Sequence, residues 1–173
     1  MCKETDTSAR ELIHAGLQNL DEARSLFRQL SASGFDAARC GLLLDALQHV
    51  CDPDVALRNL VDIVNAQVSQ GRALDDIMPD DTAFRQLVAV LGVSDAMGKL
   101  MRFRPDLVQA AATDHCNSHL YNHDQRRAHV LESVGADPND RMSPTATMDL
   151  ANAATALRRT YRNQLAAIIA QDT

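Results

Sequence analysis

Residues 92–95, Gly-Val-Ser-Asp, follow a hydrophobic run, and this order of residue types can begin a metal-dependent nucleotidyl-transfer site. Such a site holds its metal through two carboxylates, commonly as Asp-x-Asp on a strand. Here the residue two positions after Asp95 is Met97, and the run that precedes Gly92 has helical spacing. The second carboxylate ligand is therefore missing. We predict that this stretch joins two helices, and we assign no catalytic residue to it.

Histidine and cysteine gather in a second stretch, His115-Cys116-x-x-His119-x-x-x-His123, with His129 further along. On a continuous helix the first three histidines would share one face, and two imidazoles at that spacing can hold Zn²⁺ with a third ligand from a neighbour. The Asn and Ser residues between them are poor helix formers, which disfavours a continuous helix here. The sequence leaves two alternatives, a polar surface segment and a metal site, and we assign no metal ligand.

The composition limits the classes of protein to which the chain can belong. Its 173 residues suffice for one domain with a hydrophobic core. Since aromatic residues make up only 3% and Trp is absent, that core must be aliphatic. The net charge of −6 disfavours nucleic acid as a partner, because phosphate binding needs a basic face. No apolar run reaches the roughly 18 residues of a membrane span, and the N-terminus lacks a signal-peptide core. We therefore expect a cytoplasmic protein without a membrane partner.

Caps, apolar stripes and stop residues recur along the chain and predict an all-α fold. Ser8 and Glu11 form a capping box, and apolar residues at helical spacing continue to Leu30, with Gly34 as the stop. Further helices are expected over 36–50, 53–70, 84–92 and 94–104, with a polar loop over 71–81. No alternating run of β-branched residues predicts a strand. The expected architecture is an irregular bundle of about six or seven helices that ends in one long helix.

The last helix is expected to begin near Ser143-Pro144, with Ser as the cap and Pro in the first turn. Its apolar residues are Leu150, Ala154, Leu157, Tyr161, Leu165 and Ile168. This stripe predicts that Tyr161 packs against the preceding helices. Three arginines, Arg158, Arg159 and Arg162, lie on or beside the opposite face.

Three stretches of the chain match, in order, the helical motifs of one known family. Residues 52–61, DPDVALRNLV, resemble a DPxxALxxL helix, and residues 87–108, LVAVLGVSDAMGKLMRFRPDLV, resemble VLGxSxxLxxxLxxxP. Residues 157–173, LRRTYRNQLAAIIAQDT, resemble LRRxYRxxLLxIAxRDL. Together they are similar to the N-terminal region of the bifunctional glutamine-synthetase adenylyltransferase/adenylyl-removing enzymes. The departures from the family pattern are Met97, Phe103, Gln171 and the divergent stretch over 113–147.

The resemblance implies a nucleotidyltransferase that regulates glutamine synthetase. Members of the family attach AMP from ATP to a tyrosine of glutamine synthetase and remove it by phosphorolysis, in two domains that each carry a Gly-Ser-Asp-x-Asp motif and use Mg²⁺. The first such motif lies beyond the LRRxYR helix, inside which this chain ends. We therefore expect an N-terminal helical segment of the adenylyl-removing half that is inactive alone. ATP and Mg²⁺ are expected for the parent enzyme, with no cofactor in this segment.

The resemblance also implies partners, namely the parent's own nucleotidyltransferase domains, glutamine synthetase and the PII signalling protein. In that context Arg158, Arg159 and Arg162 either dock on a nucleotidyltransferase domain or form a solvated basic face. A single helical domain over 1–173 is expected, with 113–147 as a partly loop-like region within it. The alternative function is a free-standing helical module for protein interaction or metal sensing.

Overall fold

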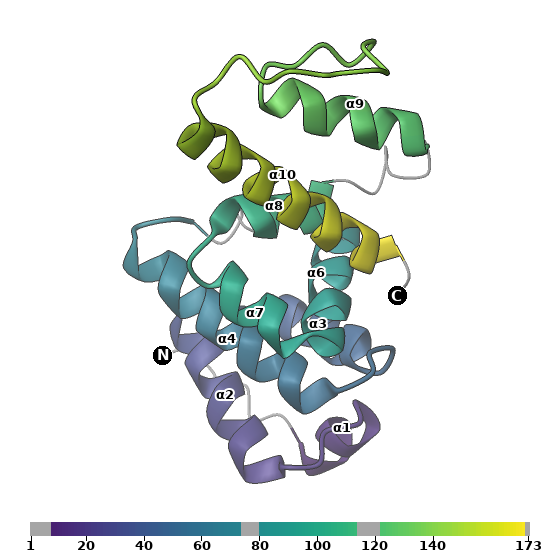
Figure 1. Ribbon diagram of the computed structural model, residues 1–173. Coiled ribbons are helices and arrows are strands. Elements are labelled where there is room, and N and C mark those ends of the chain that lie inside the picture. The colour runs from purple at the N-terminus through teal and green to yellow at the C-terminus, as the bar shows by residue number, and fades with distance from the viewer. Residues whose placement is uncertain (1–7, 74–79, 114–121, 172–173) are drawn as a thin grey trace.

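The described part of the chain, residues 8–73, 80–113 and 122–171 of a computed structural model, forms nine helices and no strand (Figure 1). This confirms the all-α prediction, although the helices outnumber the expected six or seven. The helices are α1 (Ala9–His14), α2 (Leu20–Ala32), α3 (Ala37–Leu47), α4 (Pro53–Ser69), α6 (Asp81–Val93), α7 (Asp95–Met101), α8 (Pro105–Thr113), α9 (His123–Ser133) and α10 (Leu150–Gln171). None of these helices combines the length and apolar character needed to cross a bilayer.

One expected helix, from Ser8 to Gly34, is two helices in the structure. The break occurs at Gly16, whose φ of 82° lies in the left-handed region that favours glycine. Its N–H donates to Ile13 O at 3.0 Å, and Leu17 N–H donates to Leu12 O at 3.1 Å, which closes α1 in the manner of a Schellman motif. The prediction of one continuous helix is therefore wrong here, because the left-handed turn at Gly16 ends α1, and a link over residues 15–19, with Ala15 and Leu17 buried in the core, leads to α2.

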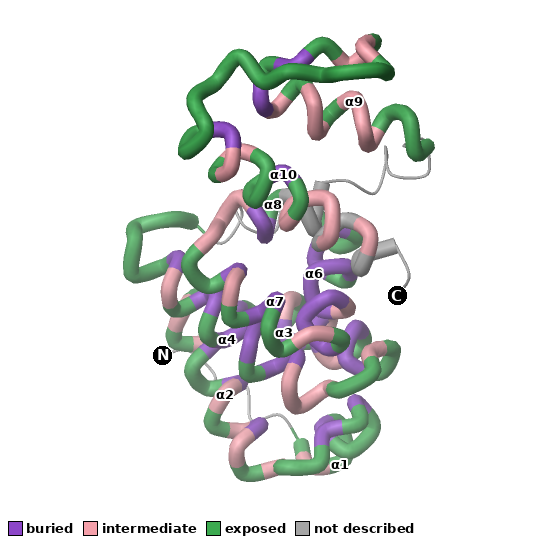
Figure 2. Tube along the Cα trace, viewed as in Figure 1, coloured by how far each residue is buried: buried purple, intermediate pink, exposed green. Residues whose placement is uncertain are grey.

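Helix α4 lies at the centre of the main hydrophobic core, packed against α2, α6 and α7 (Figure 2). Its start agrees with the sequence prediction, since Asp52 Oδ1 accepts a hydrogen bond from Val55 N–H at 3.0 Å and Pro53 is the first helical residue. It ends before Gly71, where φ is 76°. Aliphatic side chains dominate the core around it, as the composition predicted.

Gly92 was expected to end a helix, but it lies within α6 and is buried. An added Cβ at this position would lie 2.9 Å from Val50 Cβ, so the close approach of two segments requires glycine here. The helix ends one residue later, at Val93, and Ser94 separates it from α7. Gly92 is therefore a packing residue, and the prediction of its role as a stop was wrong.

Helix α10, with 22 residues, is the longest described helix, as expected for the last one. It begins at Leu150 and not near Ser143, because Asp149 supplies the cap: its Oδ1 accepts hydrogen bonds from Ala151 N–H at 3.1 Å and Asn152 N–H at 3.0 Å. Residues 134–149 connect α9 to α10, and a small cluster of Val134, Ala136 and Ala153 joins these two helices. This pair lies beside the main core (Figure 1).

Candidate functional site: the exposed face of helix α10

The stretch Gly92–Asp95 is the junction of two helices, as the sequence predicted. Ser94 Oγ accepts a hydrogen bond from Met97 N–H at 3.2 Å and caps α7. Asp95 Oδ2 lies 2.6 Å from Lys99 Nζ, one turn further along the same helix. The hydrogen bond from Lys99 lowers the pKa of the Asp95 carboxyl. The chemistry of this stretch is that of a helix cap and a surface ion pair.

The histidine-rich stretch is only partly within the described residues. His115, Cys116 and His119 lie outside them, so their arrangement stays a prediction. His123 is the exposed first residue of α9, and His129 is exposed further along the same helix. In the ranges that the structure describes, no three His, Cys, Asp or Glu side chains come together to hold a metal ion.

The structure places the three arginines of α10 in different surroundings. Arg159 is engaged within the chain, since its Nε donates to Asp106 Oδ2 of α8 at 3.2 Å. Arg158 is exposed and Arg162 is half-buried. Over the described residues, neither Arg158 nor Arg162 forms an ion pair with a carboxylate. Of the three arginines of α10, Arg158 and Arg162 are therefore the two without a carboxylate partner in the described ranges.

Asp106 lies between two guanidinium groups at the start of α8. Arg104 donates two hydrogen bonds to it, from Nε at 2.9 Å and from Nη2 at 2.7 Å, and Arg159 contributes the third. The Asp106 side chain is only 23% exposed. The hydrogen bonds from Arg104 lower the pKa of the Asp106 carboxyl, and the charges of Arg104 and then Arg159 lower it further. This charge-assisted cluster fastens α10 to α8.

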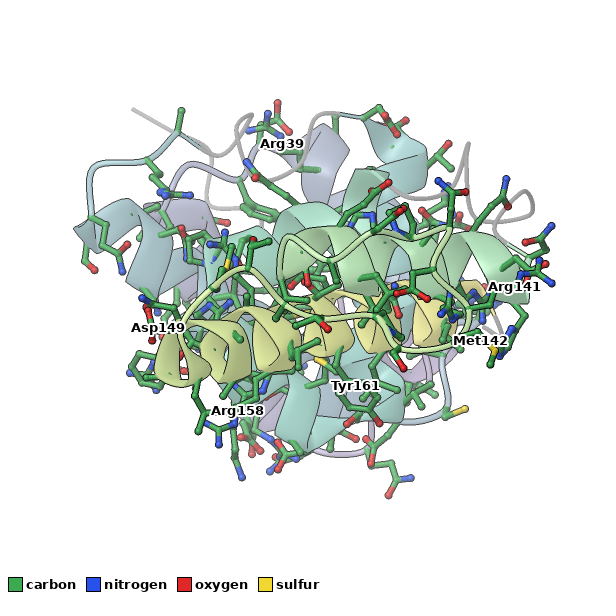
Figure 3. All side chains as sticks on the ribbon, turned by 45° about the horizontal axis from the view of Figure 1, so that its top comes forward. Arg39, Arg141, Met142, Asp149, Arg158 and Tyr161 are labelled. Atoms are coloured by element: carbon green, nitrogen blue, oxygen red, sulfur yellow. The ribbon has the colours of Figure 1, made fainter. Side chains whose placement is uncertain are left out.

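Tyr161 was predicted to pack against the preceding helices, but its exposed fraction is 64%. Leu150 and Leu157 are also exposed, and these three residues, at i, i+7 and i+11, lie on one side of α10. We call this set the exposed apolar face. Figure 3 shows Tyr161 and Arg158 projecting from the same edge of α10, on the side away from α9.

Helix α10 turns Leu150, Leu157 and Tyr161 outward, whereas Leu165 packs against the main core. Among the α10 side chains that the structure describes, Ala153 and Thr160 are buried, and Ala156 packs partly buried beside Ala153. Small residues let a helix approach its neighbours closely, and Ala153 and Ala156 belong to the cluster that α10 shares with α9 and its connection. The sequence analysis identified only the stripe with the larger apolar residues. The available signal was the regular spacing of Ala153, Ala156 and Thr160.

Comparison with known proteins confirms the resemblance that the three motifs predicted. The chain is 63% identical over 165 residues to the bifunctional glutamine synthetase adenylyltransferase/adenylyl-removing enzyme of Bifidobacterium longum, in strains DJO10A and NCC 2705. The enzyme of the same name from Bifidobacterium longum subsp. infantis is 61% identical over 165 residues. Each match covers 95% of this chain, which spans 15% of the length of these relatives. No family model and no solved structure matches the chain.

Proposed function

We propose that the chain is a non-catalytic, N-terminal helical part of a nucleotidyltransferase that adenylylates and deadenylylates glutamine synthetase. The observation that carries this proposal is the 63% identity over 165 residues to enzymes whose name states both activities. The chain spans only 15% of the length of those enzymes. The proposal therefore gives the chain a structural role and leaves the transfer of AMP to the rest of the protein.

The residues around Ser94 do not fit a site for ATP and Mg²⁺, which supports a non-catalytic role. Asp95 is paired with Lys99, and the Ser94 hydroxyl caps α7. A metal that carries a triphosphate needs a second carboxylate close by, and Met97 stands at the position where the motif would place it. The proposal accordingly assigns Mg²⁺ and ATP to the nucleotidyltransferase domains of the whole protein.

Docking on those domains is the second part of the proposal. Arg158 and Arg162 have no carboxylate partner in the described residues, and Arg158 projects from the same edge of α10 as Tyr161, with Arg162 one turn further along the helix. Arg159 has a different role, because it holds α10 against Asp106 of α8. The sequence analysis did not distinguish these three arginines, and the geometry supports a docking role for Arg158 and Arg162.

A replacement experiment tests the proposed function. In the Bifidobacterium longum enzyme, the segment that matches this chain is exchanged for the chain itself, which gives a chimaera. We expect the chimaera to add AMP to glutamine synthetase and to remove it, whereas the 173-residue chain does neither. An enzyme from which the segment is deleted is the control. Loss of both activities in a folded chimaera, or transfer of AMP by the chain alone, contradicts the proposal.

A further inference from the structure

The exposed apolar face of α10 has the dimensions of a site for one helix. The exposed apolar face runs from Leu150 to Tyr161, eleven residue steps along the helix, which is about 16 Å or three helical turns. The exposed fractions of Leu150, Leu157 and Tyr161 are 87%, 40% and 64%. Three large apolar side chains exposed on one face of one helix are typical of a surface that another segment covers. An amphipathic helix covers such a face with apolar residues three, four and seven positions apart.

The charge of α10 specifies what kind of segment fits. Between Leu150 and Gln171 the helix carries three arginines and no Asp or Glu, in a chain whose net charge is −6. Arg159 is neutralised by Asp106, and Arg158 and Arg162 have no such partner among the described residues. Arg158 projects from the same edge of the helix as Tyr161 (Figure 3). A segment with carboxylates beside its apolar residues would pair with these cations.

A second copy of this chain is a poorer occupant. Two copies of α10 packed through the exposed apolar face would bring arginine close to arginine, with no carboxylate on either helix to separate the charges. Like charges at an interface oppose association. By contrast, the relatives contain a further 85% of chain that this sequence does not include, since the match spans 15% of their length. That additional chain is the nearest source of an acidic partner helix.

We infer that the exposed apolar face of α10 binds an acidic amphipathic helix from the remaining part of the same enzyme, an inference that rests on the proposed function. Leu150, Leu157 and Tyr161 supply the apolar contact, and Arg158 and Arg162, one turn apart on the same side of this face, pair with carboxylates of the partner helix. The contact is intramolecular, so the partner is present at a high effective concentration and a small apolar area suffices.

Thiol labelling tests this inference directly. The substitution Tyr161→Cys is made both in the 173-residue chain and in the chimaera. Each protein is treated with a maleimide, and the labelled fraction of the peptide that contains position 161 is followed by mass spectrometry. We expect labelling to be at least about tenfold slower in the chimaera, because the partner helix covers this position. An Ile13→Cys variant is the matched control, since Ile13 is 61% exposed on α1 and far from α10 in sequence. Its labelling rate should be the same in both proteins.

Reversing the charge of Arg158 tests the electrostatic contribution to the contact separately from the apolar contribution. In the chimaera, Arg158→Glu should restore fast labelling at position 161, because it places a carboxylate against the acidic partner. Arg28→Glu, at an exposed arginine of α2, should leave the rate unchanged. In the 173-residue chain, neither substitution should alter labelling.

Three results would overturn the inference. They are equal labelling of position 161 in chain and chimaera, protection that appears only when glutamine synthetase is added, and protection of the 173-residue chain that rises with its own concentration. The last two results identify glutamine synthetase or a second copy as the occupant. AMP transfer is measured on the chimaera that keeps Tyr161, and labelling on its Tyr161→Cys variant, so the two proposals fail separately. An active chimaera with unprotected position 161 contradicts only the inference, and an inactive chimaera with protected position 161 contradicts only the proposed function.

Discussion

Arg159 Nε lies 3.2 Å from Asp106 Oδ2 and links α10 to α8 across 53 residues of sequence. The same carboxylate receives two hydrogen bonds from Arg104. Asp106 is therefore the acceptor that two guanidinium groups share, and its removal would leave both without their partner. This relationship distinguishes Arg159 from Arg158, its neighbour in sequence, which is exposed and has no carboxylate partner in the described residues.

Replacing Asp106 with Asn should lower the free energy of unfolding by about 1–2 kcal/mol, because a partly buried, charge-assisted cluster loses its anion. Arg158→Ala should change it by no more than about 0.5 kcal/mol, as is usual for an exposed side chain. Urea denaturation of the two variants measures both values. Equal effects would show that the Asp106 cluster contributes no more than an ordinary surface position.

The lowered pKa of Asp106 predicts a pH dependence of stability. A carboxyl whose folded pKa is lowered stabilises the fold above its unfolded pKa, and this contribution is lost as the pH falls through the folded pKa. Since the unfolded value for Asp is about 4, the loss should begin near that pH and continue below it. In denaturation series between neutral and strongly acidic pH, the difference between the natural chain and Asp106→Asn should shrink as the pH falls. A constant difference would contradict the assignment.

Two aromatic residues should respond oppositely to truncation. Phe84 is 3% exposed and belongs to the main core, so Phe84→Ala should cost about 3–5 kcal/mol. Tyr161 is 64% exposed, so Tyr161→Ala should cost less than about 1 kcal/mol in the isolated chain. Thermal and chemical denaturation of both variants provide the measurement. If Tyr161→Ala lowered the free energy of unfolding by several kcal/mol, Tyr161 would be buried, as the sequence pattern predicted.

Two glycines within helices should also differ. Gly92→Ala should destabilise the chain, because the added methyl group would lie 2.9 Å from Val50 Cβ. Gly41→Ala, in α3, should stabilise it by about 0.5–1 kcal/mol, since no described atom beyond the adjoining residues and backbone of α3 lies within 4 Å of the new methyl group and alanine favours a helix. For each variant, the sign of the change in denaturation midpoint shows whether the substitution stabilises or destabilises the chain. Stabilisation by both substitutions would refute the close contact at Gly92.

The side chain of Gln67 is fully buried in α4, and neither of its polar atoms has a hydrogen-bond partner within the described part of the chain. An unpaired buried amide costs about 1–3 kcal/mol, so Gln67→Met, which keeps a similar shape, should raise the free energy of unfolding by about 1 kcal/mol. Gln67→Ala is the control, because it removes the amide but leaves a cavity, and it should destabilise. A loss of stability in the Met variant would indicate that the amide has a bound water as its partner.

Much of the local structure was determined by residues only a few positions apart. The capping box of Ser8 and Glu11 is present, with Ser8 N–H donating to Glu11 Oε2 at 2.8 Å, and Ser94 caps α7 as expected. A cap depends on a side chain and a backbone N–H two or three residues away, so sequence alone can identify it. The three motifs also led to the correct relatives, because the order of short patterns is a property of the sequence.

The tertiary structure decided which side of each helix is buried and which charged groups meet. On α10 a stripe of larger apolar residues and a series of small residues are both present in the sequence, and among the described side chains packing buries Ala153 and Thr160 and leaves Tyr161 exposed. Likewise, Gly92 became a packing residue because Val50 lies against it. The periodicity of apolar residues is a property of one helix in isolation. Which side of that helix is buried depends on the shape of the neighbouring helices against which it packs. For the same reason only the fold could separate Arg159, which reaches Asp106, from Arg158, which faces outward.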